Sequence, residues 1–241
     1  MKPYFERLYK DTNSAFMTEV RERLAQNRKT FIVTANPEAF MFGEKDPEMH
    51  TLLMDEAVTV VADGIGIVKG AAMLDVAVAE RIPGVDLAEN LMQYGHELGK
   101  SIFLLGSKQE VLDAMGKVLA EKYPNLTVAG AIHGYVPDKD AAFEEIVAAK
   151  PDIVLVALGI PAQEKLIYKH LSKFEKGIFV GVGGSLDVLS GSKERAPAFF
   201  IRHNLEWLYR ILKEPKRIKR FYNSHVKFIF RVRKEGRKLN R

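Results

Sequence analysis

The segment Val58-Thr59-Val60-Val61-Ala62-Asp63-Gly64-Ile65-Gly66 contains the pattern on which the fold of this chain depends. Its first five residues are apolar or β-branched on both faces, as the buried strands of parallel sheets are. An aspartate and two glycines then end the run, which is typical of a tight turn from a strand into a helix. The segment therefore predicts a buried strand that presents a carboxylate at its carboxyl end.

Five further apolar runs of strand length occur along the chain, at Phe31–Ala35, Ile102–Leu105, Leu126–Ala131, Ile153–Ala157 and Ile178–Val182. Segments with helical periodicity lie between them, and one such stripe consists of Val111, Leu112, Met115, Val118 and Leu119. Pro37, Asp138 and Pro161 stand where helices are expected to begin. This alternation predicts an α/β fold similar to the Rossmann fold, with a mostly parallel sheet and helices on both of its faces.

The composition of the chain changes near Ala196-Pro197. From Arg202 to Arg241 there are 14 Lys and Arg against 3 Asp and Glu, a net charge of +11, whereas the rest of the chain has a net charge of −6. We expect an α/β catalytic core over residues 1–195 and a basic helical appendage over residues 196–241. One helix is predicted around Phe199–Lys213, and another from Pro215 to about Lys234.

The second of these predicted helices is amphipathic. Its apolar side carries Ile218, Phe221, Tyr222, His225, Val226, Phe228, Ile229 and Val232, and its basic side carries Lys216, Arg217, Lys219, Arg220, Lys227, Arg231 and Lys234. A basic amphipathic helix is typical of a segment that lies in the interface of an anionic membrane. The alternative is that the apolar side packs back on the core, and both arrangements are compatible with the sequence.

Cysteine is absent, which excludes disulfides, thiolate metal sites and thiol nucleophiles. The first ten residues lack the apolar segment of a signal peptide, and no run of about 18 apolar residues occurs. We expect a cytoplasmic protein that attaches peripherally to the inner face of the membrane.

Polar and glycine-rich residues follow every predicted strand. In open α/β sheets ligands bind beyond the carboxyl ends of the strands, so these residues are predicted to form one cleft. They are Thr34, Asn36, Asp63, Gly106, Ser107, Tyr135, Gly159, Gln163, Glu164, Gly183, Gly184, Ser185 and Asp187. Because glycine lets backbone N–H groups approach a phosphate closely, Gly106-Ser107 and Gly183-Gly184-Ser185 are predicted to bind a diphosphate.

Two charged residues at this edge have a functional and a structural interpretation. Asp63 is placed to take a proton from an acceptor hydroxyl, and partial burial would raise its pKa and strengthen it as a base. Its structural interpretation is a helix N-cap. Arg81 is suited to hold a diphosphate in bidentate fashion, or else it forms a surface ion pair with Glu80 or Asp86.

The sequence predicts neither a metal site nor a cofactor. Asp138-Lys139-Asp140 resembles the Asp-x-Asp metal motif of many sugar-nucleotide transferases, but it begins a helix after Pro137, and capping explains it. Gly64-Ile65-Gly66 matches part of a dinucleotide fingerprint, but the third glycine is Gly70 and the motif follows the second strand. An NAD-dependent oxidoreductase remains the distant alternative. A nucleic-acid binder is disfavoured because the core is acidic.

Taken in order, the motifs resemble the WecG/TagA/CpsF family of glycosyltransferases along nearly the whole chain. The segments that carry the resemblance are Thr34–Glu38, Ala62–Gly66, Arg81–Leu87, Leu104–Gly106, Ala157–Glu164, Gly181–Asp187, Arg195–Pro197, Leu205–Arg210, Glu214-Pro215 and Arg217. Members of this family usually begin with a short apolar strand and a glycine. Here Met1–Asp11 is polar and aromatic, which puts that edge strand in doubt.

The resemblance implies inverting transfer of a sugar from a UDP-sugar to an acceptor sugar on undecaprenyl diphosphate. The best-known type of member transfers N-acetylmannosamine to lipid-linked N-acetylglucosamine, the linkage unit of wall teichoic acid. UDP-N-acetylmannosaminuronic acid, UDP-glucose and other hexose donors remain alternatives, and a homo-oligomer is possible.

The resemblance also implies roles for individual residues. Asp63 would be the general base, and Thr34, Asn36, Arg81 and Gln163 would line the reaction site. Arg210, Arg217 and Arg220 would reach the lipid diphosphate or the membrane. The remaining residues of the cleft would bind the donor, with Tyr135 and Asp187 assigned to uracil or ribose.

Overall fold

The computed structural model describes residues 1–239, apart from the side chains at positions 217, 220 and 239. Within that range six strands form one parallel sheet in the order β2-β1-β6-β5-β3-β4. The strands are β1 (Thr30–Ala35), β2 (Val58–Ala62), β3 (Ser101–Gly106), β4 (Thr127–Ile132), β5 (Ile153–Ala157) and β6 (Ile178–Gly181). They coincide with the six predicted runs to within one residue at each end, which confirms the prediction of a parallel α/β sheet.

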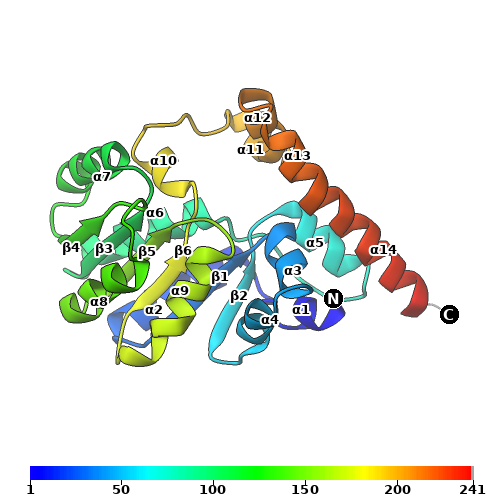
Figure 1. The fold of residues 1–241 in the computed structure, drawn as a ribbon, viewed down its shortest axis with the longest axis horizontal. Coiled ribbons are helices and arrows are strands. Elements are labelled where there is room, and N and C mark those ends of the chain that lie inside the picture. The colour runs from blue at the N-terminus through cyan, green and yellow to red at the C-terminus, as the bar shows by residue number, and fades with distance from the viewer. Residues whose placement is uncertain (240–241) are drawn as a thin grey trace.

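Helices cover both faces of the sheet (Figure 1). One face packs against α2 (Asn13–Ala25), α6 (Gly84–Glu97), α7 (Gln109–Lys122) and the short α10 (Ser185–Leu189). The other packs against α1 (Lys2–Glu6), α3 (Pro37–Gly43), α4 (Pro47–Met54), α5 (Ile65–Ala72), α8 (Lys139–Ala149) and α9 (Ala162–His170), the last continued by the 3-10 turn Leu171–Lys173. Two apolar clusters, one on each face, form the core.

The pairing of β1 with β2 places the predicted catalytic carboxylate. Ala35 lies opposite Ala62 at the end of both strands, and the backbone N–H of Asp63 donates to the carbonyl of Ala35 at 3.0 Å. Asp63 therefore leaves the sheet directly beside the end of β1. The chain then turns through Gly64, the N-cap of α5, as the strand-to-helix pattern predicts.

The N-terminal segment forms the helix α1 rather than the edge strand that the sequence put in doubt. Its side chains Tyr4, Phe5 and Leu8 are buried. The segment therefore contributes to the core, although its composition is largely polar and aromatic. Leu8 makes an isolated parallel bridge with Val60 of β2, the outermost strand on that side. The segment thus covers part of an open sheet edge, which is a usual way of protecting such an edge.

The appendage begins with two short helices, α11 (Ala198–Arg202) and α12 (Glu206–Lys213). The prediction of one helix over Phe199–Lys213 was wrong. Asn204 adopts a left-handed conformation with φ of 59°, which asparagine tolerates better than most residues and which ends a right-handed helix. This break separates α11 from α12.

The rest of the appendage is one long helix that runs along one side of the core, beside α3 and α5 (Figure 1). It consists of α13 (Arg217–Phe221), a π-helical turn at Tyr222–Val226 and α14 (Lys227–Leu239). Phe228 and Val232 are 1% and 0% exposed, and both belong to the apolar cluster that contains Phe5. The alternative in which the apolar side packs on the core is therefore confirmed for these two residues, whereas Ile218, Tyr222 and Ile229 remain exposed.

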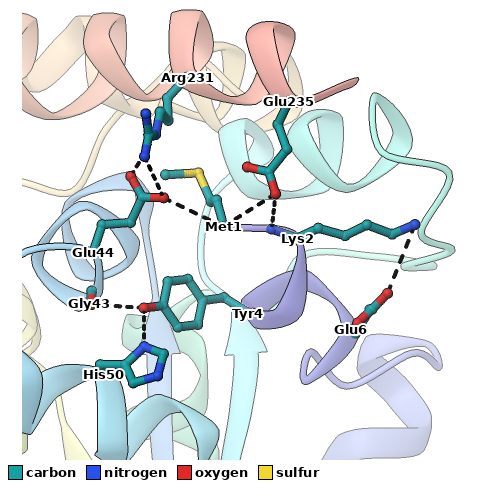
Figure 2. Close-up of polar contacts among 9 residues, drawn as sticks. All are labelled: Met1, Lys2, Tyr4, Glu6, Gly43, Glu44, His50, Arg231 and Glu235. Atoms are coloured by element: carbon teal, nitrogen blue, oxygen red, sulfur yellow. Dashed lines mark hydrogen bonds and ion pairs between the residues drawn. The ribbon is translucent and has the colours of Figure 1, made fainter. Parts of the chain in front are cut away.

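Polar contacts fasten α14 to the start of the chain (Figure 2). Arg231 Nε donates to Glu44 Oε2 at 2.9 Å, and Glu235 Oε1 accepts the backbone N–H of Lys2 at 2.8 Å. Gly236 lets α14 approach α5 closely, because a Cβ there would lie 2.7 Å from the carbonyl oxygen of Met73. None of the helices in residues 1–239 has the length and apolar composition needed to cross a membrane.

Candidate active site

Asp63 lies where β2, α6 and the appendage meet. Its Oδ1 accepts the backbone N–H of Gly84 at 2.7 Å, at the first residue of α6. The structural interpretation of Asp63 as the cap of the helix that follows it is wrong, because Gly64 holds that position without a side-chain bond. Asp63 is instead bound to the N-terminus of a helix 21 residues further along the chain.

Burial raises the pKa of Asp63 above its usual value, and the negative charge of Glu206 raises it further. The hydrogen bond from Gly84 and the positive charges of Arg210 and Arg81 act in the opposite direction, but burial is the largest effect. A carboxylate with a raised pKa is a better proton acceptor near neutral pH.

Arg81 lies in the loop between α5 and α6 and faces the appendage. Its Nη1 is 2.9 Å from Oε1 of Glu206, and the two side chains are only 21% and 13% exposed. The predicted partners of Arg81 were wrong: Glu80 accepts the backbone N–H of Asn13, and Asp86 pairs with Arg195. Glu206 is not among the predicted site residues, although an acidic residue one helical turn before Arg210 is a recognisable signal.

Thr34 and Asn36 are held by the elements around them. Thr34 is buried, and its Oγ1 donates to the carbonyl of Gly181 at 3.2 Å. A Cβ at Gly84 would lie 3.2 Å from this Oγ1, so Thr34 is next to the residue that binds Asp63. Asn36 caps α3: its Oδ1 accepts the N–H groups of Glu38 at 2.9 Å and Ala39 at 3.1 Å.

Gln163 joins two glycine loops. Its Oε1 accepts the backbone N–H groups of Gly159 at 3.0 Å and Gly183 at 3.1 Å, and its Nε2 donates to Glu164 Oε1 at 2.7 Å. Both side chains are buried against Gly181, where a Cβ would lie 2.5 Å from Gln163 Nε2. Gln163 therefore fixes the loops after β5 and β6 relative to each other.

A second group of predicted residues meets at the ends of β3 and β4. Ser107 Oγ lies 3.3 Å from Asp187 Oδ2, and the carbonyl of Ser107 accepts the N–H of Gly134 at 2.8 Å. Gly106 has φ of 116°, and a Cβ there would lie 2.4 Å from the carbonyl oxygen of Ala157, so only glycine fits. Tyr135 follows Gly134 and is exposed. Ser185 is the first residue of the five-residue helix α10, directly after Gly184.

The appendage arginines are only partly described. Arg210 of α12 is exposed but close enough to Asp63 to lower its pKa. The predicted roles of Arg217 and Arg220 fall on side chains outside the described part of the chain.

The Asp138-Lys139-Asp140 triplet is explained by capping and ion pairs. Asp138 caps α8 by accepting the N–H of Ala141 at 2.9 Å, which confirms that interpretation, and Asp140 pairs with Lys169 at 2.8 Å. Among the described residues, no group of three or more His, Asp and Glu is placed to hold a metal ion.

A cavity of about 340 Å³ opens between α4, α8 and α9, next to Gly134. Two of its cations have carboxylate partners, because Lys165 lies 3.0 Å from Glu48 and Lys169 pairs with Asp140. Its charge is therefore largely balanced within the protein.

A parallel sheet with glycine turns at its carboxyl edge, and a buried carboxylate between guanidinium groups, defines an α/β enzyme that handles phosphorylated substrates. The sequence profile of the Glycosyl transferase WecG/TagA/CpsF family matches residues 7–241. The chain belongs to this family and is a glycosyltransferase. This assignment confirms the resemblance and rules out the oxidoreductase alternative.

Named relatives come from Staphylococcus aureus. Proteins of strains MW2, NCTC 8325 / PS 47 and MRSA252 are each 36% identical to this chain over 237 residues, which is 97% of the chain and 92% of the relative. Each is called N-acetylglucosaminyldiphosphoundecaprenol N-acetyl-beta-D-mannosaminyltransferase.

Proposed function

We propose that this glycosyltransferase moves N-acetylmannosamine from its UDP derivative to N-acetylglucosamine on undecaprenyl diphosphate, with inversion, and so makes the linkage unit of wall teichoic acid. The observation that carries the proposal is the 36% identity to transferases of that name along 97% of the chain. The arrangement around Asp63 supports it, because a single carboxylate of raised pKa lies among positive groups suited to a diphosphate.

In the proposed reaction the acceptor hydroxyl attacks the anomeric carbon of the donor sugar from the face opposite UDP. A new bond forms between the hydroxyl oxygen and that carbon, and the bond from the carbon to the β-phosphate oxygen breaks. The bonding electrons leave with UDP, and the hydroxyl proton passes to Asp63. One base is sufficient because UDP departs as a stabilised anion. General-base catalysis typically contributes about 10²–10⁴-fold, and holding the two substrates together contributes more.

The leaving diphosphate requires positive partners. We assign this role to Arg81, to Arg210 and to the backbone N–H groups of the glycine loops, with Arg217 and Arg220 toward the lipid diphosphate. Arg81 and Arg210 already act on Asp63, which supports their position at the reacting centre.

Donor binding is proposed for the loops after β3 to β6. Ser107 of the loop after β3 contacts Asp187 of α10, and Gln163 holds the loops of Gly159 and Gly183 together. These contacts support one shared binding surface for UDP. Exposed Tyr135 is assigned to the uracil or the ribose.

The enzyme is proposed to work peripherally at the inner face of the membrane, where its lipid-linked acceptor lies. The appendage combines a net charge of +11 with exposed apolar side chains. These side chains are Phe199, Trp207, Leu212, Ile218, Tyr222 and Phe230. An anionic lipid surface matches both features.

A product assay tests the proposed reaction. The full-length protein is offered a panel of UDP-sugars and a short-chain lipid-diphosphate N-acetylglucosamine, with and without EDTA, and products are identified by mass spectrometry. We expect transfer of N-acetylmannosamine that persists in EDTA. The Asp63→Asn variant should bind UDP normally but lose on the order of 10²-fold or more in turnover.

Transfer of another sugar would retain the family and replace the proposed donor. Loss of activity in EDTA that Mg²⁺ restores would add a metal to the mechanism. Full turnover by Asp63→Asn would remove Asp63 as the base.

A further inference from the structure

Glu206 links the appendage to the reaction site. It is the first residue of α12, and its carboxylate contacts Arg81 of the core across 125 residues of sequence. The other described ion pair of α12 runs from Lys213 Nζ to Glu194 at 3.2 Å, where both side chains are well exposed. Of these two ion pairs of α12, the one between Glu206 and Arg81 is therefore the more buried.

The same helix brings two opposite charges to Asp63. Glu206 and Arg210 are one helical turn apart, and both act on the pKa of Asp63, as does Arg81 from the core. Asp63, Arg81, Glu206 and Arg210 form a group of two carboxylates and two guanidinium groups. Removing one member of a buried ion pair leaves its partner uncompensated, so this group depends on the charge of Glu206.

We propose that Glu206 is a positioning residue for sugar transfer: its carboxylate holds Arg81 and docks α12 on the core, so that Arg210 reaches Asp63. This inference rests on the proposed function of the site. Glu206 is a positioning residue and not a catalytic one, because it acts through Arg81 and through the placement of its own helix.

The main test is Glu206→Gln, which keeps the shape of the side chain and removes its charge. Glu194→Gln is the matched control, because it removes a carboxylate that pairs with the same helix in an exposed setting. With the donor that the product assay identifies, we expect Glu206→Gln to lower kcat on the order of 10- to 100-fold, since small displacements of reacting groups are costly. Glu194→Gln should retain full kcat.

Two readouts distinguish positioning from a general structural defect. The acidic limb of the kcat profile should shift in Glu206→Gln, because burial, Glu206 and Arg210 all act on the pKa of Asp63 and a displaced α12 changes these effects. The chain contains no cysteine, so spin labels at Gln93→Cys on α6 and Leu212→Cys on α12 report docking directly.

We expect a narrow distance distribution between these labels in the parent and in Glu194→Gln, and a broader or shifted one in Glu206→Gln. The label measurement requires no substrate, so it tests docking even if the proposed reaction fails. Unchanged kcat, pH profile and label distances in Glu206→Gln would overturn the inference.

Discussion

At the scale of single residues, Glu164 is a buried carboxyl group whose pKa lies well above its usual value. It is 1% exposed, and burial raises its pKa to about 7 against a usual 4.5. The hydrogen bond from Gln163 lowers this pKa and the charge of Glu38 raises it, but neither outweighs burial. Near neutral pH Glu164 is therefore partly protonated, at the point where Gln163 fixes two glycine loops.

The raised pKa makes stability depend on pH. The folded state binds this proton more tightly than the unfolded state, so the stabilisation is complete below about pH 4.5 and is lost as pH rises through about 7. Between pH 5 and pH 8 the parent should therefore lose more unfolding free energy than Glu164→Gln, which cannot ionise. The difference should be about 3 kcal/mol at most, and urea unfolding at both pH values measures it.

The control for this comparison is Glu145→Gln, which alters an exposed glutamate on α8. It should follow the parent at both pH values. A constant difference in unfolding free energy between the parent and Glu164→Gln at both pH values would show that Glu164 does not titrate in this range.

At the scale of elements, α14 is part of the core although it belongs to a basic, amphipathic segment. Phe228 lies 6.0 Å from Phe5 between ring centroids, and Gly70 makes room for both rings. The ion pair of Arg231 with Glu44 continues this contact at the surface (Figure 2). The appendage thus packs on the core through α14 and contacts Arg81 of the core through α12.

Two phenylalanines on α14 make this arrangement testable. Phe228→Ala should lower the unfolding free energy by about 3–5 kcal/mol, because it removes a buried ring and leaves a cavity. Phe230 is two residues away and 65% exposed, and Phe230→Ala should change stability by no more than about 0.5 kcal/mol. Denaturant unfolding of both variants gives the comparison, and equal losses would show that α14 is not packed as described.

At the scale of the whole molecule, charge is separated along the chain. In the proposed attachment to a membrane, the acidic remainder and the appendage of net charge +11 would orient the protein toward the anionic surface, where each basic residue is worth about 1 kcal/mol. Salt weakens this attraction because it shortens the distance over which charges act.

Vesicle sedimentation tests this orientation. Binding to vesicles with anionic lipid should fall as salt rises and should be weak on neutral vesicles. Leu212→Ser should weaken binding because it removes an exposed apolar side chain from the appendage. Val128→Ser, which alters an exposed apolar residue of β4, should bind like the parent. Equal binding to neutral vesicles at all salt concentrations would contradict the electrostatic part of the proposal.

The sequence by itself determined the elements and the family. Strands such as Val58–Ala62 are recognisable because burial on both faces requires a continuous apolar run, and Asn36 and Asp138 cap helices through contacts with residues two or three positions away. The order of the glycine and carboxylate motifs was sufficient for the family. These features depend on interactions between residues that are close in sequence, so the order of the amino acids is sufficient to predict them.

Only the tertiary structure decided which distant groups meet. The partner of Arg81 is Glu206 rather than a neighbouring acid, and Asp63 binds Gly84 rather than capping its own helix. Phe228 is buried and Phe230 exposed, although a helical pattern alone allows the apolar side to face lipid or protein. Ion pairs and packing between residues far apart in sequence depend on how the sheet orders its strands and where the appendage returns to the core, and neither is encoded in local periodicity.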